Sequence, residues 1–339
     1  MKNLFPHLLG NGHTKKLMAE DIRRGTFLHA CILEAVKGAG VEDVAFDIAA
    51  ALACTRKDSG KLPCGACPSC RKIEGRTCVD VITVDKGDKA TIGVDKIRAM
   101  KQDAVLTPSE LDCKIYVLKE AERLTEEAQN ALLKLLEEPP VENTYFILCT
   151  ENAEALLPTV RSRAPVTRLT PPERDEVCRA LTEERPVSRE DALLAAAIAE
   201  NGIALAREVL DGTDEGKRKT ELYNHARRLT EMLAEKKSKT EIILYISSLS
   251  AKKEEATEIL RLIYSGLRDI IAVKRCKDCT TDLYQTPEHV RRYAGKMTVR
   301  SAVRISDAVS EALVSLEKNA SPKTVLLAFA VSAHNAVFG

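Results

Sequence analysis

Residues 35–43 read Ala-Val-Lys-Gly-Ala-Gly-Val-Glu-Asp, and they connect a short apolar run to a helical pattern. The run Cys31–Leu33 has the composition of a buried strand, and Val44, Ile48 and Leu52 recur on one face of a helix. A glycine-containing turn between a strand and a helix is the arrangement of a phosphate-binding loop, whose working form is G-x-x-x-x-G-K-S/T. The segment therefore predicts the α/β fold of a nucleotide-binding protein.

The same loop lacks the side chains that bind phosphate and metal. Ala35 stands at the first glycine of the motif and Gly40 at the second, with Gly38 between them. Val41 replaces the lysine that contacts the outer phosphates, and Glu42 replaces the hydroxyl that coordinates Mg²⁺. We therefore expect an ATPase fold without ATP hydrolysis. Weak nucleotide binding stays open, because the two glycines still allow close backbone approach.

A second nucleotide motif departs from its pattern in the same direction. In such a motif an apolar strand ends in Asp-Glu, which holds Mg²⁺ and polarises the attacking water. The strand-like segment 114–118 is instead followed by Lys119 and Glu120. A cation at the first of these positions repels the metal, and Glu120 is left as a lone carboxylate. Two independent motifs thus predict that this chain alone has no ATPase activity.

The strongest metal signal is a group of cysteines with the spacing C-x9-C-x2-C-x2-C: Cys54, Cys64, Cys67 and Cys70. Four thiolates suit tetrahedral Zn²⁺ and leave no open coordination position, so we predict a structural zinc site. Unrelated free thiols and an iron–sulfur cluster are the alternatives. Cys276 and Cys279 form a second C-x2-C without a further ligand pair nearby, and we assign it no role.

The segment 157–163, Leu-Pro-Thr-Val-Arg-Ser-Arg, precedes the last strand-like run at 165–169. An arginine side chain is planar and permanently charged, which suits it to phosphate. Beside an inactive loop it has no phosphate to meet in its own chain. It can act in trans, as an arginine finger at a neighbour's ATP site. The alternative is an ordinary surface salt bridge.

Composition excludes several classes of function. The 339 residues carry a net charge of +1, only 4% aromatic residues and no Trp, which argues against a base-stacking or strongly polyanion-binding surface. We find no run of about 18 apolar residues and no signal-peptide core, so we expect a cytoplasmic protein without membrane contact. Cysteines in that compartment are thiols or metal ligands rather than disulfides.

The chain divides by pattern. Strand-like and helix-like segments alternate as far as about residue 170, which favours a parallel sheet with helices on both faces. The rest is wholly helical. We expect an α/β core at 1–170 with the zinc module at 54–70, an all-α lid at 171–212, a charged linker at 213–219, and an all-α domain at 218–339.

Together these motifs resemble the clamp-loader AAA+ family. The resemblance rests on the four-cysteine module and on three segments, of which Ala128-Gln-Asn-Ala-Leu-Leu-Lys-Leu-Leu-Glu-Glu-Pro-Pro140 is the most specific; the others are Thr91-Ile-Gly-Val-Asp-Lys-Ile-Arg98 and 157–163. It implies a RecA-like AAA+ core, a lid, and a collar at 218–339 that joins a five-membered ring of subunits.

The resemblance also implies a function. Some members of this family do not hydrolyse ATP but present a Ser-Arg-Cys motif to the ATP site of the adjacent motor subunit. Ser162 and Arg163 match its first two positions, and Ala164 departs from the third. The implied partners are the gamma/tau ATPase and delta subunits of a bacterial DNA polymerase III clamp loader. The sliding clamp and primer–template DNA are reached through that assembly, in which this chain is a rigid scaffold.

Two other functions remain as alternatives. A gamma/tau-like motor would hydrolyse ATP, but Val41, Glu42 and Lys119 argue against it. A zinc-ribbon module would bind nucleic acid, and the modest charge and few aromatic residues argue against that. Arg207 lies near the position expected for a sensor arginine of the lid, although its register is not fixed.

Overall fold

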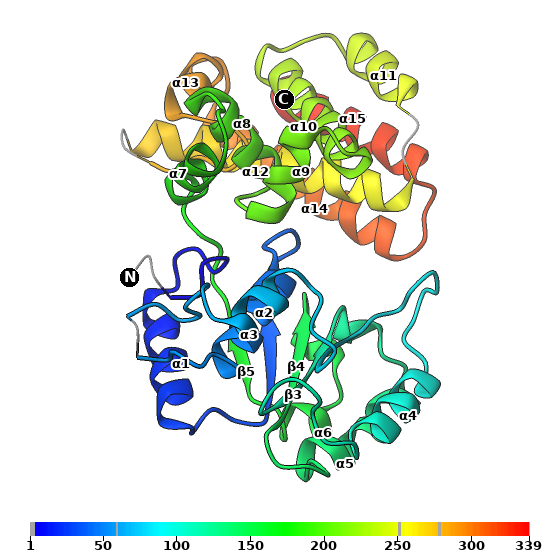
Figure 1. The fold of residues 1–339 in the computed structure, drawn as a ribbon. Helices are drawn as coiled ribbons and strands as arrows, with labels where there is room; N and C mark the ends of the chain where they lie inside the picture. Colours follow the sequence, from blue (N-terminus) through cyan, green and yellow to red (C-terminus); the bar gives the residue numbers. More distant parts are fainter. Residues whose placement is uncertain (1–3, 59, 250–251, 277–278, 339) are drawn as a thin grey trace. The chain divides into compact units, whose positions relative to one another are not determined.

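The computed structural model describes residues 4–58, 60–249, 252–276 and 279–338, and Figure 1 shows the chain as a ribbon. The chain forms two compact units. The first comprises the residues up to Glu176 together with Gly202–Ala204, and the second comprises Val177–Asn201 and the residues from Leu205 onward.

A parallel sheet forms the centre of the first unit. Its strand order is β2-β3-β4-β1-β5, and the strands are β1 (Ala30–Glu34), β2 (Val81–Val84), β3 (Lys114–Leu118), β4 (Thr144–Thr150) and β5 (Val166–Arg168). All residues of β3 are buried, because helices cover the sheet on both faces. A strand in such a position is usually rich in apolar residues, as 115–118 are. Strand β1 lies between β4 and β5, so the loop that follows it begins inside the sheet rather than at an edge.

Helices cover both faces of this sheet (Figure 1). One face carries α1 (Gly12–Arg24), α2 (Val41–Leu52) and α3 (Pro68–Glu74); the other carries α4 (Val94–Asp103), α5 (Glu126–Glu137) and α6 (Pro158–Arg161). Successive residues of β1 alternate between the faces, so Leu33 packs with the first group and Ile32 with the second. Short 3₁₀ turns lie at Ala121–Arg123 and Ala153–Ala155. The predicted α/β core with helices on both faces is confirmed.

Helix α5 forms where the most specific motif predicts it. Thr125 caps its first turn, since the hydroxyl oxygen accepts the N–H of Ala128 at 3.2 Å. The face of the helix that carries Leu132, Leu135 and Leu136 is buried. The helix ends at Glu137, before the two prolines that cannot continue it. The last residue of the helix, Glu137, is thereby exposed at the surface.

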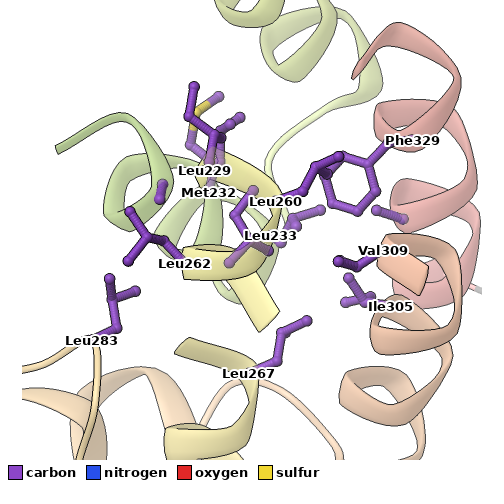
Figure 2. Packing of buried hydrophobic residues seen from close by; sticks show 14 of the residues in the cluster. Leu229, Met232, Leu233, Leu260, Leu262, Leu267, Leu283, Ile305, Val309 and Phe329 are labelled. Carbon is purple, nitrogen blue, oxygen red and sulfur yellow. The ribbon is translucent and has the colours of Figure 1, made fainter. Parts of the chain in front are cut away.

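The regular secondary structure of the second unit is entirely helical within its described residues. Its helices are α7 (Arg174–Glu184, which begins in the first unit), α8 (Arg189–Ile198), α9 (Ile203–Asp211), α10 (Asp214–Ala234), α11 (Lys239–Ser248), α12 (Lys253–Arg275), α13 (Pro287–Ala294), α14 (Val299–Glu317) and α15 (Pro322–Phe338). Figure 2 shows Leu229, Leu233, Leu260, Ile305 and Phe329 meeting in its core. The predicted helical C-terminal part is confirmed.

The linker expected at 213–219 is wrong, because helix α10 begins there. The Thr213 hydroxyl accepts the N–H of Gly216 at 3.1 Å and caps the helix, and acidic residues in the first turn favour its positive end. Lys219 is buried and forms an ion pair with Glu258 of α12. A charged, glycine-containing stretch is thus the first turn of a packed helix.

Candidate functional site

The loop after β1 contains two glycines in left-handed backbone conformations. Gly38 and Gly40 have φ values of 78° and 75°, which lie in a region that residues other than glycine rarely adopt. The space beside the loop is nevertheless nearly filled. A Cβ built on Gly40 would lie 3.3 Å from the Cβ of Ala204, and the N–H of Ala204 donates to the carbonyl of Gly38 at 3.2 Å.

Two cavities adjoin the loop: an open one of about 450 Å³, lined in part by Glu42, Asp43 and Lys119, and a small, mostly apolar one on the side of Ala35. The small cavity has a volume of about 20 Å³ and is lined by residues that include Ala35, Val41, Val44 and Ile203. A single water needs a volume of about 10–15 Å³ on this measure. The small cavity therefore has room for about one water, far less than a nucleotide requires.

The two departures from the nucleotide motifs meet in space. Lys119, just after β3, places its Nζ 2.5 Å from Oε2 of Glu42 in the first turn of α2. Glu120 has a partner of its own: its Oε1 accepts a hydrogen bond from Nζ of Lys86 at 2.8 Å. Sequence analysis treats the two motifs separately and misses their pairing. The available signal was the opposite sign of two substitutions at positions that share one metal ion in a working ATPase.

The four cysteines converge as predicted. Their sulfur atoms lie within 4.8 Å of one another, and those of Cys64 and Cys70 are 3.9 Å apart. Tetrahedral Zn–S bonds of about 2.3 Å place two sulfurs about 3.8 Å apart. Among the described residues, this is the only group of histidine, cysteine or carboxylate ligands that could hold a metal ion. The donor set therefore fits a structural metal.

Backbone N–H groups point at these sulfurs. The N–H of Arg56 donates to Cys54, that of Cys67 to Cys64, and that of Cys70 to Cys67, at N–S distances of 3.4–3.5 Å. Such donors stabilise thiolates. Burial acts to raise the pKa of the Cys67 thiol, but the N–H groups of Cys70 and Thr55 outweigh it and lower that pKa to about 6. Burial instead raises the pKa of the Cys54 and Cys70 thiols, so a metal ion would have to displace protons from those two sulfurs.

Arg163 lies at the surface just after α6 and is held by its own chain. Its Nε donates to Oε1 of Glu137 at 2.5 Å, and its Nη1 donates to the carbonyl of Thr159 at 2.9 Å. The Oγ of Ser162 lies 3.4 Å from Nη1 and donates to the same carbonyl. The Arg163 side chain is 31% exposed and that of Glu137 is 48% exposed. Ala164, where the family motif has Cys, is fully buried.

The neighbouring arginine has different surroundings. Arg161 contacts Glu154 at 2.6 Å, Arg168 approaches the same carboxylate at 3.6 Å, and Arg168 contacts Glu34 at 2.7 Å. Hydrogen bonds from the N–H of Ala153 and from Arg168 lower the pKa of Glu34, which is the last residue of β1. A chain of ion pairs thus links α6 to the strand that carries the loop, and Arg163 stands outside it.

Two other candidates receive less support. Arg207 makes a bidentate pair with Glu184, with N–O distances of 2.9 and 2.6 Å. Cys276 is exposed and Cys279 half-buried, while 277–278 lie outside the described residues. The partner that sequence analysis missed is Glu137, which lies in the most specific motif but was given no role.

Comparison with known proteins finds similarity to subunits of DNA polymerase III. Residues 10–173 match the family described as DNA polymerase III, delta subunit. The DNA polymerase III subunit delta' of Haemophilus influenzae is 32% identical over 210 residues, which are 62% of this chain and 62% of that protein. The delta' subunit of Escherichia coli is 36% identical over 184 residues, or 54% of each chain.

A gamma subunit is also similar. The DNA polymerase III subunit gamma of Buchnera aphidicola is 34% identical over 159 residues, which are 47% of this chain and 43% of that protein. In each case the matched part spans less than two thirds of the relative's length. None of the described helices is both long and apolar enough to cross a membrane.

Proposed function

We propose that this chain is a delta'-type clamp-loader subunit that does not hydrolyse ATP. The match of residues 10–173 to the family described as DNA polymerase III, delta subunit, and the similarity to two delta' subunits support this proposal. In this proposal it supplies Arg163 in trans to the ATP site of a neighbouring gamma/tau subunit. It also gives the loader a rigid scaffold during the loading of the sliding clamp.

The Lys119–Glu42 ion pair carries the first half of the proposal. Mg²⁺ bound with ATP would need a carboxylate at the end of β3 and a hydroxyl at the start of α2. An ammonium group stands at the first position and pairs with the carboxylate at the second. The metal would have to displace a cation that already satisfies this charge. The small apolar cavity beside the loop supports the same conclusion for the nucleotide.

Arg163 carries the second half. Its guanidinium is partly exposed, and it belongs to no ion pair that reaches the chain's own loop. An arginine finger needs those two properties, because it must extend to phosphate oxygens outside its own chain. Arg161 is similarly exposed, at 28%, but it lacks the second property, since its guanidinium contacts Glu154 within the network that leads to β1.

The four-cysteine cluster would hold Zn²⁺ in a structural role. Its four sulfurs would fill all four positions of a tetrahedral ion, which leaves no open ligand position for catalysis. The metal would supply rigidity only. It would fix the end of α2 to α3, the helix that contributes Cys70.

The remaining partners follow from the family. We propose that 171–212 act as the lid and that 218–339 act as the collar that joins the ring with gamma/tau and delta. The chain would reach the sliding clamp and primer–template DNA through that ring.

Single-turnover ATP hydrolysis by the reconstituted loader tests the proposal. An arginine finger contributes about 10³-fold or more to the rate at its site. Replacing Arg163 with Ala should therefore remove the share of the rapid phase that belongs to the adjacent site. Arg161→Ala is the matched control and should leave the rapid phase unchanged.

The chain without its partners serves as the blank and should hydrolyse no ATP. Hydrolysis by the blank would favour a gamma/tau-like motor instead. A rapid phase of unchanged amplitude in the Arg163→Ala loader would exclude the role in trans and leave a purely architectural subunit.

A further inference from the structure

The guanidinium of Arg163 forms hydrogen bonds and an ion pair within its own chain, although its proposed role is at the ATP site of another subunit. The Nε, Nη1 and Nη2 atoms all contact acceptors of the same chain, namely the Glu137 carboxylate and the Thr159 carbonyl. A phosphate would need the same N–H donors of the guanidinium that these acceptors now engage. Extension toward a neighbour's ATP site therefore requires the contact with Glu137 to break.

The contact is of the right kind to break reversibly. Glu137 is the last residue of α5, is 48% exposed, and carries the negative charge that a γ-phosphate also offers. Ion pairs between partly exposed side chains shift an equilibrium by about two- to five-fold. Such a bias can hold the guanidinium back when no phosphate is present, yet a phosphate with more charge and more acceptors can outcompete it.

We propose that Glu137 is a latch for Arg163: its carboxylate competes with the neighbour's γ-phosphate and holds the arginine in a retracted position until the two subunits close. The inference rests on the proposed role of Arg163 in trans and adds a regulating residue to it. Glu137 contacts neither substrate nor metal, so its effect runs through the conformation of Arg163. By this reasoning the latch lowers ATP hydrolysis in the loader that has not bound DNA.

Glu137→Gln tests the latch, because the amide keeps the shape of the side chain and removes its charge. The readout is ATP hydrolysis by the full loader without DNA, where the retracted position should prevail. We expect Glu137→Gln to raise this rate by about two- to five-fold at low ionic strength. The increase should shrink in about 0.15 M salt, where charges more than about 8 Å apart are largely screened and exposed pairs weaken.

Glu138→Gln is the matched control. Glu138 lies one position further along, is exposed, and forms no ion pair with another described residue. Its substitution removes the same charge from the same surface and should leave the rate unchanged. An equal increase in Glu138→Gln would overturn the latch, since it would show a general effect of surface charge.

A second background separates the latch from the role of Arg163. In loaders that carry Arg163→Ala, Glu137→Gln should have no effect, because there is no guanidinium to release. Loss of the rapid phase in Arg163→Ala together with an unchanged or lower DNA-independent rate in Glu137→Gln would overturn the latch alone. No effect of Arg163→Ala would overturn the proposed function, and the latch with it.

Discussion

Substitution of the Lys119–Glu42 pair tests whether two lost nucleotide motifs now form one stabilising contact. The two charged groups approach to 2.5 Å, and their side chains are 29% and 39% exposed. Two unit charges about 4 Å apart attract by about 1 kcal/mol in water and about 4 kcal/mol at an effective dielectric constant of about 20. Because both side chains still contact solvent, we discount the pair to about 1 kcal/mol.

A double-mutant cycle measures this value. Glu42→Gln and Lys119→Met each break the pair, and each should lower the free energy of unfolding by about 1 kcal/mol. For a domain of about 150–250 residues that corresponds to about 2–4 °C in the melting temperature. The double variant should lose about as much as one single variant, because the pair can be broken only once. Far-ultraviolet circular dichroism during heating gives the four values.

Reversal of the pair supplies the control. Glu42→Lys with Lys119→Glu keeps opposite charges in contact, so most of the coupling should return. A small loss should remain, because a cation in the first turn of α2 opposes the helix dipole by about 0.5 kcal/mol. Strictly additive losses in the double variant would refute the reasoning. So would a Lys119→Met variant as stable as the original chain.

Three further predictions concern the metal and the two cores. Cys67→Ser should abolish stoichiometric zinc in the purified chain and lower its melting temperature, as metal analysis and thermal unfolding would show. Leu132→Ala in α5 should cost about 2–5 kcal/mol in urea unfolding, while the exposed Lys134→Ala should change stability by less than about 0.5 kcal/mol. Burial raises the pKa of Asp269 to about 6, although the backbone N–H groups that donate to its carboxylate act to lower that pKa. Since the unfolded value is about 3.9, the stability of the second unit should fall as pH rises from about 4 to about 6, and Asp269→Asn should remove that slope.

The sheet and α5 were predictable from sequence because their signals are local and agree with one another. Strand β3 is a continuous apolar run, and α5 combines a helical period, a capping Thr125 and a stop at two prolines. The cysteine cluster was predictable for a similar reason, since its ligands are close in sequence and turns bring them together. In each case one short segment contains most of the contacts that decide its structure.

The rest depends on contacts between distant segments. Composition predicted a linker at 213–219, whereas the ion pair of Lys219 with Glu258 helps to place a helix there. The pairing of Lys119 with Glu42 joins the end of a strand to the start of a helix that precedes it in the chain. Glu137 approaches Arg163 only because α5 ends beside α6. Such partners cannot be read from the spacing of residues within one segment.

In the proposed function a chain without ATP chemistry serves a neighbour's ATP site, and the position of these contacts is consistent with that role. In an active subunit the end of β3 and the start of α2 are tied through Mg²⁺ and nucleotide, so their geometry changes with each turnover. Here the ion pair between Lys119 and Glu42 connects the same two segments, and it needs neither ATP nor Mg²⁺. Arg163 takes no part in the ion pairs that run from Glu34 to Arg161. In the proposed function the contact that must break before Arg163 extends is the one with Glu137.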